Sequence, residues 1–427
     1  MKTFIKTNFL QKHYIFSLFI LTMLGIMIGL SQGYDPRYTL YVSTLYLLPC
    51  LAFYSLFHFL GVRLGMASFI NRTAGRLSLQ HRVSPQQITL AFLVFIVLVI
   101  IIHAIYVQGF PGYKALTEFK QLRIFSLRKS VTSDIPGWLK YIYSFSIKAI
   151  IPVGLVYMHL YKKKKAMFVF VLLAFFIGIN SMQKSHFLTF FIPLTLLLFY
   201  HRQFRKGLLL IGGILFCIVF MIFVTNPALK YSALSPFLNE AKERTIKKDM
   251  DKGAVNEPRM NIGEANEKAV NSLILRTFYL PGSTVGKWFK AIPRKKPFLH
   301  GKGYKLYCAV TGETFHDYSR ELYPVLYPHY AKRGFAGSVN VASFMYEYAN
   351  FGLWGLPLSA FIITLILLTV TFVFRGDWTM QILLNTIPVL FLSSGSYTSL
   401  LLSGGWGLII LLYILLLHPT KIQQQHA

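Results

Sequence analysis

A group of basic side chains between two apolar stretches is the first feature of this sequence that points to chemistry. Arg123, Arg128 and Lys129 lie in residues 108–141, where basic residues outnumber acidic ones. Arginine pairs bidentately with phosphate oxygens, so the group suits a diphosphate. Contact with anionic lipid headgroups would explain the same charges equally well. The sequence leaves both interpretations open.

Lys184 is a second candidate phosphate ligand. It lies in the polar turn 180–186, between two apolar stretches that together cover residues 166–200. If both stretches cross a bilayer, each helix has about 17 residues, the lower limit for a span. The turn is then expected below the membrane surface, where irregular backbone is tolerated only inside protein or beside a wet cavity. Lys148, in another apolar stretch, is expected to reach the interface through its long side chain.

Glu347 is the first candidate for a general base. It is the only acidic residue in the segment 322–376, and it lies where a loop enters an apolar stretch. Asn340, Tyr348 and Asn350 lie near it in the sequence, and we expect them to bind the substrate. A carboxylate in this position can take a proton from a substrate hydroxyl, or it can pair with an arginine of the preceding loop.

Tyrosines alternate with basic residues in the segment 304–333. Aromatic rings offer flat faces to sugars, and hydroxyl, imidazole and guanidinium groups donate hydrogen bonds to sugar hydroxyls. An aromatic belt at a membrane interface explains some of the tyrosines, but it explains the interleaved His and Arg less well. The candidate sugar ligands are Tyr304, Tyr327, Arg320 and Arg333, and His316 and His329 are further candidate bases.

The elements that must position these residues are membrane helices. The chain of 427 residues is 54% hydrophobic and only 14% charged, with a mean hydropathy of +0.51, which excludes a disordered chain and an ordinary soluble domain. Its uncharged runs approach the ~20 residues that cross a bilayer, so we expect an all-α polytopic membrane protein of about ten spans. These are residues 14–32, 39–61, 88–107, 142–161, 166–181, 186–200, 207–225, 352–374, 379–394 and 399–417.

The distribution of Lys and Arg over the short loops predicts the orientation. Loops rich in these residues lie in the cytoplasm, which places both termini there and the two longer loops on the outer face. The expected division is therefore residues 1–225 with seven helices and a medium periplasmic loop 108–141, a large periplasmic loop 226–338, and residues 339–427 with three helices.

Charge and motifs also limit the partners. The net charge of +29 is cut into separate patches by the lipid-crossing segments, so no nucleic-acid partner is predicted. Asp249 and Asp251 form an Asp-x-Asp pattern among lysines, where we expect solvated side chains rather than metal ligands. No Gly-rich phosphate loop is present. The sequence predicts no metal site and no cofactor.

Four stretches of the chain resemble the Wzy family, the oligosaccharide repeat-unit polymerases of O-antigen and capsule synthesis. They are the arginines of the first long loop, the turn 182–185, the Arg276-x-Phe-x-x-Pro-Gly282 stretch, and Asn340 leading into the Tyr-Ala-Asn-Phe-Gly stretch 348–352. The similarity in topology covers nearly the whole chain, and the motifs cover about a sixth of it.

The resemblance implies a membrane glycosyltransferase with GT-C-like architecture in the bacterial inner membrane. Such an enzyme transfers a growing glycan from undecaprenyl diphosphate onto the non-reducing end of a new lipid-linked repeat unit, without a cofactor. A chain-length regulator and a flippase of the same pathway are the partners that the resemblance suggests. We expect Arg276 to stabilise the departing diphosphate, with Arg123, Arg128, Lys129 and Lys184 in support, and Glu347, His329 or His316 to act as the base.

Three other functions compete with this one. An O-antigen ligase has similar topology, but such ligases resemble one another in a His-Asn-x-x-Leu stretch, and none of the 12 histidines here precedes an asparagine. A transferase that uses polyprenyl-phosphate sugars would need an acid in the first outer loop, where Asp35 lies in a tight turn. A flippase or transporter of lipid-linked oligosaccharide would favour short loops and intramembrane charges.

Overall fold

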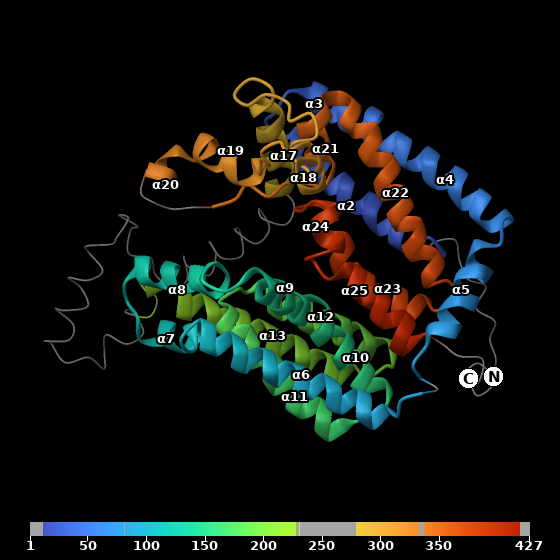
Figure 1. The fold of residues 1–427 in the computed structure, drawn as a ribbon, viewed down its shortest axis with the longest axis vertical. Helices are drawn as coiled ribbons and strands as arrows, with labels where there is room; N and C mark the ends of the chain where they lie inside the picture. Colours follow the sequence, from blue (N-terminus) through green and yellow to red (C-terminus); the bar gives the residue numbers. More distant parts are fainter. Residues whose placement is uncertain (1–11, 81, 228–229, 231–278, 333–336, 419–427) are drawn as a thin grey trace, which may run out of the picture. The chain divides into compact units, whose positions relative to one another are not determined.

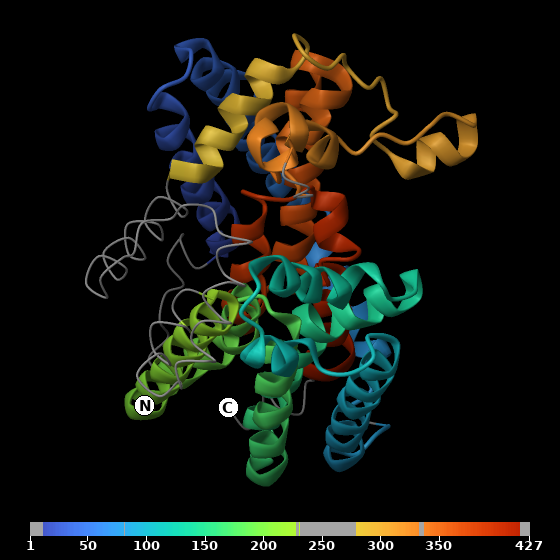
Figure 2. The same cartoon turned by 90° about the vertical axis from the view of Figure 1, so that its left-hand side faces the viewer.

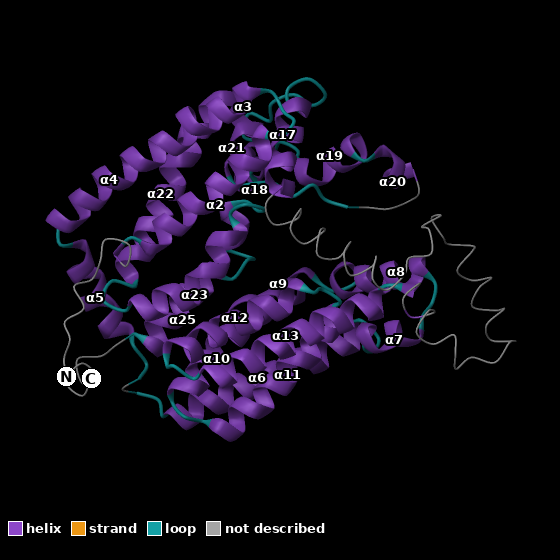
Figure 3. Cartoon of the chain, turned by 180° about the vertical axis from the view of Figure 1, so that it is seen from behind, coloured by secondary structure: helices purple, strands orange, loops and turns teal. Residues whose placement is uncertain are grey.

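The chain is helical throughout the part that the structure describes. The computed structural model describes residues 12–80, 82–227, 230, 279–332 and 337–418, and these contain helices and loops but no strand (Figure 3). Eight helical segments are long and apolar enough to cross a membrane: Tyr14–Ser31, Pro36–Arg63, Pro85–Tyr106, Gly137–Leu160, Lys164–Ser181, Phe204–Thr225, Phe344–Val373 and Tyr397–Leu417. Ser185–Tyr200 and Trp378–Phe391 are shorter apolar helices. The prediction of an all-α polytopic membrane protein is confirmed.

The chain divides into two compact units. Unit 1 comprises Met1–Thr73 and Met260–Leu401, and unit 2 comprises Ala74–Arg259 and Leu402–Ala427. This division differs from the one drawn from loop lengths, because it groups helices by their packing rather than by their order along the chain. The first boundary between the units, after Thr73, lies within the helix α5 (Met66–Leu77). The last boundary, after Leu401, lies within the apolar segment Tyr397–Leu417.

Unit 1 is built around the apolar segments Tyr14–Ser31, Pro36–Arg63 and Phe344–Val373 (Figure 1). The helix α22 packs on α4 and on α21, and α2 packs on α23 and α17. In chain order its elements are α2 (Tyr14–Ser31), α3 (Pro36–Tyr41), η1 (Val42–Leu47), α4 (Leu48–Arg63), α17 (Leu280–Ala291), α18 (Lys305–Thr311), α19 (Tyr318–Leu326), α20 (Pro328–Lys332), α21 (Phe344–Phe351), η5 (Gly352–Trp354), α22 (Gly355–Val373), α23 (Trp378–Phe391) and α24 (Tyr397–Leu401).

The helix α17, in the segment predicted as the large periplasmic loop, packs against α2. Figure 2 shows α17, in yellow, beside the blue N-terminal helices. The approach is so close that a Cβ atom on Gly282 would lie 2.3 Å from the carbonyl oxygen of Ile26 and 2.4 Å from the nitrogen of Leu30. Only glycine, which has no Cβ, allows the two backbones to come this near.

The apolar segment Phe344–Val373 begins earlier than the sequence predicted, since the expected span started at residue 352. The reason is that α21 and α22 join through the short 3₁₀ turn η5, where Gly352 has a φ of +62°. A positive φ interrupts the regular helix and is readily adopted by glycine. Glu347, on α21, therefore lies inside the apolar helical segment instead of in the loop before it.

Unit 2 contains the remaining apolar helices. The helix α10 packs on α11 and α12, and α12 packs on α13. A capping box of Ser84 and Gln87 begins the third apolar segment. In chain order the elements are α6 (Pro85–Tyr106), α7 (Pro111–Thr117), α8 (Gln121–Ser133), α9 (Gly137–Phe145), η2 (Ser146–Ile150), α10 (Ile151–Leu160), α11 (Lys164–Ser181), α12 (Ser185–Tyr200), α13 (Phe204–Thr225), α25 (Trp406–Leu412) and η6 (Tyr413–Leu417). The medium loop predicted at 108–141 thus contains two short helices, α7 and α8, and the start of α9.

Candidate functional site

The Glu347 carboxylate lies at the centre of a buried polar group in unit 1. Its side chain belongs to α21 and the residue is 1% exposed. The Tyr304 hydroxyl donates a hydrogen bond of 3.0 Å to Glu347 Oε1, and the Tyr397 hydroxyl donates another to the same oxygen. Glu347 Oε2 accepts no hydrogen bond from any described residue. One oxygen is thus held by two donors while the other stays available as an acceptor.

The hydroxyl of Tyr304 is a donor at any ordinary pH. Burial and the charge of Glu347 raise the pKa of this phenol well above its usual value near 10. A tyrosine in this state keeps its proton, so it can orient the carboxylate but cannot take a proton in its place. The proton acceptor of this group is therefore Glu347.

Three further hydroxyl groups lie buried in the same unit. Tyr46, Ser343 and Ser359 are fully buried. The Tyr46 hydroxyl interacts with both serine hydroxyls and lies close enough to Glu347 for the two groups to interact electrostatically. Buried polar groups are nearly always paired in native proteins, and these three hydroxyls pair with one another beside the acid.

Asn350 and Tyr348, both expected to bind substrate, instead connect α21 to the preceding segment. Asn350 Oδ1 accepts a hydrogen bond of 3.1 Å from the backbone nitrogen of Gly303, next to Tyr304. The Tyr348 hydroxyl donates one of 3.1 Å to the carbonyl oxygen of Ile292. Both residues are buried. Their contacts hold Tyr304 against α21 and so position the hydroxyl that binds Glu347.

The two candidate histidine bases contact residues outside the Glu347 group. His316 Nδ1 lies 2.9 Å from Glu321 Oε1, and Lys296 Nζ lies 2.9 Å from the other oxygen of that carboxylate. Burial raises the pKa of Glu321, but the hydrogen bonds from Lys296 and His316 outweigh it and leave the pKa below its usual value. His329, on α20, is exposed beside the ring of Tyr330.

The remaining sugar-ligand candidates of unit 1 lie at or near the surface. Arg320 is exposed and pairs with Asp317 at 3.3 Å. The Tyr327 hydroxyl accepts a hydrogen bond of 2.9 Å from Lys287, and Asn340 is exposed. The structure therefore joins Tyr304 to Glu347 but distributes the other candidates over separate contacts.

The polar turn between α11 and α12 is partly buried within unit 2: residues 180–182 and His186 are buried, Gln183 and Lys184 are half-buried, and Ser185 is exposed. Met182 in the turn has a φ of +54°, and His186 Nδ1 lies 2.8 Å from the Ser181 hydroxyl. Arg128 and Lys148 lie close enough for their charges to act on the buried His186 ring. Arg128, Lys148 and His186 are called the basic cluster below.

Not every basic residue of the first long loop belongs to this cluster. Arg123 is exposed and lies 3.4 Å from Glu118. Lys129 is exposed on α8, and Lys184 is half-buried in the turn, two positions before His186. Lys148 is half-buried and lies near His186, a position that its apolar sequence context did not indicate.

Two candidates and one rejected motif fall outside the described residues. Arg276, expected to stabilise the departing diphosphate, and Arg333 both lie there, as do Asp249 and Asp251. Among the residues that are described, no three His, Cys, Asp or Glu side chains gather as metal ligands.

Tyr397 is the member of the Glu347 group that sequence reasoning missed. It follows a Ser-Gly-Ser stretch near the C-terminal end of the chain and lies 50 positions after Glu347. No motif marks it, and only the fold of unit 1 brings its hydroxyl to the carboxylate.

A comparison of the chain with protein-family models, with curated proteins and with solved structures finds no match.

Proposed function

We propose that the chain is a glycan polymerase that extends a lipid-linked oligosaccharide at the outer face of a bacterial plasma membrane. The observation that carries the proposal is the buried Glu347 carboxylate, with two tyrosine hydroxyls on one oxygen and the other oxygen available. An acid inside an apolar helical segment is costly and points to function rather than stability.

The reaction requires one proton acceptor and one leaving group. A hydroxyl of the acceptor sugar gives its proton to Glu347 Oε2 as its oxygen forms a bond to the anomeric carbon of the donor sugar. The bond from that carbon to the diphosphate breaks, and the electron pair leaves with the diphosphate. Tyr304 and Tyr397 hold the carboxylate in one orientation, so that the free oxygen faces the proton it must take.

Cations stabilise the leaving group in this mechanism. Negative charge builds on the departing diphosphate, so basic side chains that bind it more tightly in the transition state lower the barrier. We assign this role to Arg276 on the strength of the family resemblance.

A transporter of lipid-linked oligosaccharide is the second candidate. The helix break at Gly352, five residues after an intramembrane acid, favours it, since interrupted helices and buried carboxylates are common at transporter binding sites. The polymerase is preferred because a general base needs this arrangement. Two donors fix one carboxylate oxygen, and the other oxygen is available to accept a proton.

A purified-protein assay tests the proposal. The detergent-solubilised protein is incubated with undecaprenyl-diphosphate repeat units from its host, and the products are separated on a gel. Wild type is expected to give a ladder spaced by one repeat, and Glu347→Gln is expected to lower the rate about 10²–10⁴-fold, the range for loss of a general base. Glu313→Gln is the matched control, because Glu313 is exposed and pairs with Lys302 at 2.9 Å in the same unit.

Two results would overturn the assignment. A ladder from Glu347→Gln at the wild-type rate would remove Glu347 from the mechanism. If wild type gives no ladder but moves the lipid-linked substrate across the bilayer of proteoliposomes, the transporter replaces the polymerase.

A further inference from the structure

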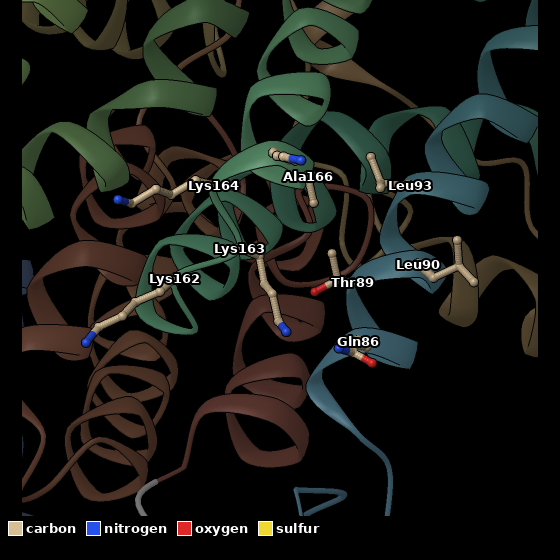
Figure 4. A pocket seen from close by; sticks show the side chains of 9 residues that line it. Gln86, Thr89, Leu90, Leu93, Lys162, Lys163, Lys164 and Ala166 are labelled. Carbon is tan, nitrogen blue, oxygen red and sulfur yellow. The ribbon is translucent and has the colours of Figure 1, made fainter.

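A lysine-rich pocket in unit 2 contains none of the residues of the two groups described above. It is lined by Gln86, Thr89, Leu90 and Leu93 of α6 and by the residues 162–166 that lead from α10 into α11. Figure 4 shows the Lys163 side chain extending on the side of the pocket that carries Gln86 and Thr89. The pocket has a volume of about 510 Å³, within the range of small-molecule sites.

The two ends of this pocket differ in chemistry. Four consecutive lysines, 162–165, contribute positive charge, and none of them forms an ion pair with an acid in the described ranges. The other wall is apolar and belongs to a membrane-spanning helix, with Leu90 61% exposed and Leu93 and Ala166 beside it. A ligand for this pocket therefore combines an anionic group with a hydrocarbon chain.

We propose that this pocket binds one anionic phospholipid. Its phosphate lies near Lys163, which extends toward Gln86 and Thr89 (Figure 4), and its acyl chain lies along Leu90 and Leu93 on the surface of α6. The lysines on either side of Lys163 add positive charge to the segment. Lysines that only set the orientation of a membrane protein need no pocket, whereas a basic pocket between membrane helices is a form typical of sites for acidic headgroups.

The position of the pocket along the helices supports this occupant. It lies at the first turns of α6 and α11, the ends that the excess of Lys and Arg predicts to face the cytoplasm. Anionic lipids give that leaflet a negative surface potential, which attracts basic residues near the membrane. A phospholipid already in the leaflet can enter the pocket from the side of Leu90, which is exposed.

Native mass spectrometry of the whole purified protein tests the proposal. The probes are phosphatidylglycerol and phosphatidylcholine with identical acyl chains. We expect one retained phosphatidylglycerol in preference to phosphatidylcholine, and a loss of its binding on the order of 100-fold in the triple variant Lys163→Gln, Lys164→Gln, Lys165→Gln. The matched control replaces Arg63, Arg72 and Arg76 with Gln, which removes the same charge from residues that do not line the pocket.

A second variant separates a pocket from general surface charge. Ala166→Phe fills the apolar side and keeps every lysine, so it is expected to lower phosphatidylglycerol binding at least tenfold. The proposal is overturned if this variant binds like wild type, or if the arginine control loses as much binding as the lysine variant. Inorganic phosphate at millimolar concentration is expected not to displace the lipid, and displacement would identify a site for free phosphate instead.

Discussion

The substitution Gly282→Ala tests how the long loop is anchored on the membrane helices and how it positions Glu347. The added Cβ would lie 2.3 Å from the carbonyl oxygen of Ile26, while ordinary contacts begin near 3.4 Å. Because the obstacle is the backbone of α2, no side-chain rotation can make room. The two helices must separate by about 1 Å, which weakens dispersion contacts along the whole of their interface.

The expected cost follows from this displacement. Inserting a methyl group into a tightly packed site costs about 1–3 kcal/mol, and a clash between two backbones belongs at the upper end of that range. For a unit of this size, each kcal/mol lowers the melting temperature by about 2–4 °C, so a cost of about 3 kcal/mol corresponds to a fall of about 6–12 °C. Activity should fall as well, because Phe289 of α17 packs edge-on against Tyr348 of α21 at 4.6 Å between ring centroids.

Thermal unfolding in detergent, followed with a thiol-reactive dye, measures the effect. Cys50 and Cys308 are buried in unit 1 and react when it opens. Gly25→Ala is the matched control, because Gly25 lies on the same helix α2 and a Cβ there would meet no atom within 4 Å; it should leave the melting temperature unchanged or slightly raised. If Gly282→Ala melts together with wild type, α17 is not seated on α2 in the way described.

Two further predictions concern single side chains. Tyr397→Phe leaves Tyr304 as the one remaining donor to Glu347 among the described residues. We expect polymerisation in the gel assay to slow about tenfold with little change in melting temperature; wild-type rates would show that Tyr397 does not orient the carboxylate. Burial lowers the pKa of Lys230 from 10.5 to about 8, so the unfolded chain binds more protons than the folded protein between these values and stability rises with pH across that window. Lys230→Met should abolish this rise in melting temperature, and an unchanged slope would contradict the reasoning.

The positions of the membrane helices could be predicted because they depend on local composition. A segment near 20 apolar residues lowers its free energy by leaving water as a helix, and each of the ten predicted ranges coincides with an apolar helix of the structure. The depth of the turn 180–186 in a membrane stays a prediction from the length of its flanking segments. Helix ends were less predictable, and the early start at Phe344 depends on how Gly352 lets α21 pack beside α22.

The site required the tertiary structure. The sequence singled out Glu347 as an isolated acid, but its two hydrogen-bond donors lie 43 positions before it and 50 positions after it. The packing of unit 2 likewise brings Lys148 near His186, a neighbour that the sequence did not indicate. Apolar length is a property of each segment by itself, so the sequence alone determined which segments are membrane helices. The partners of a polar side chain depend on which helices pack together, and that is decided by contacts between segments far apart in the chain.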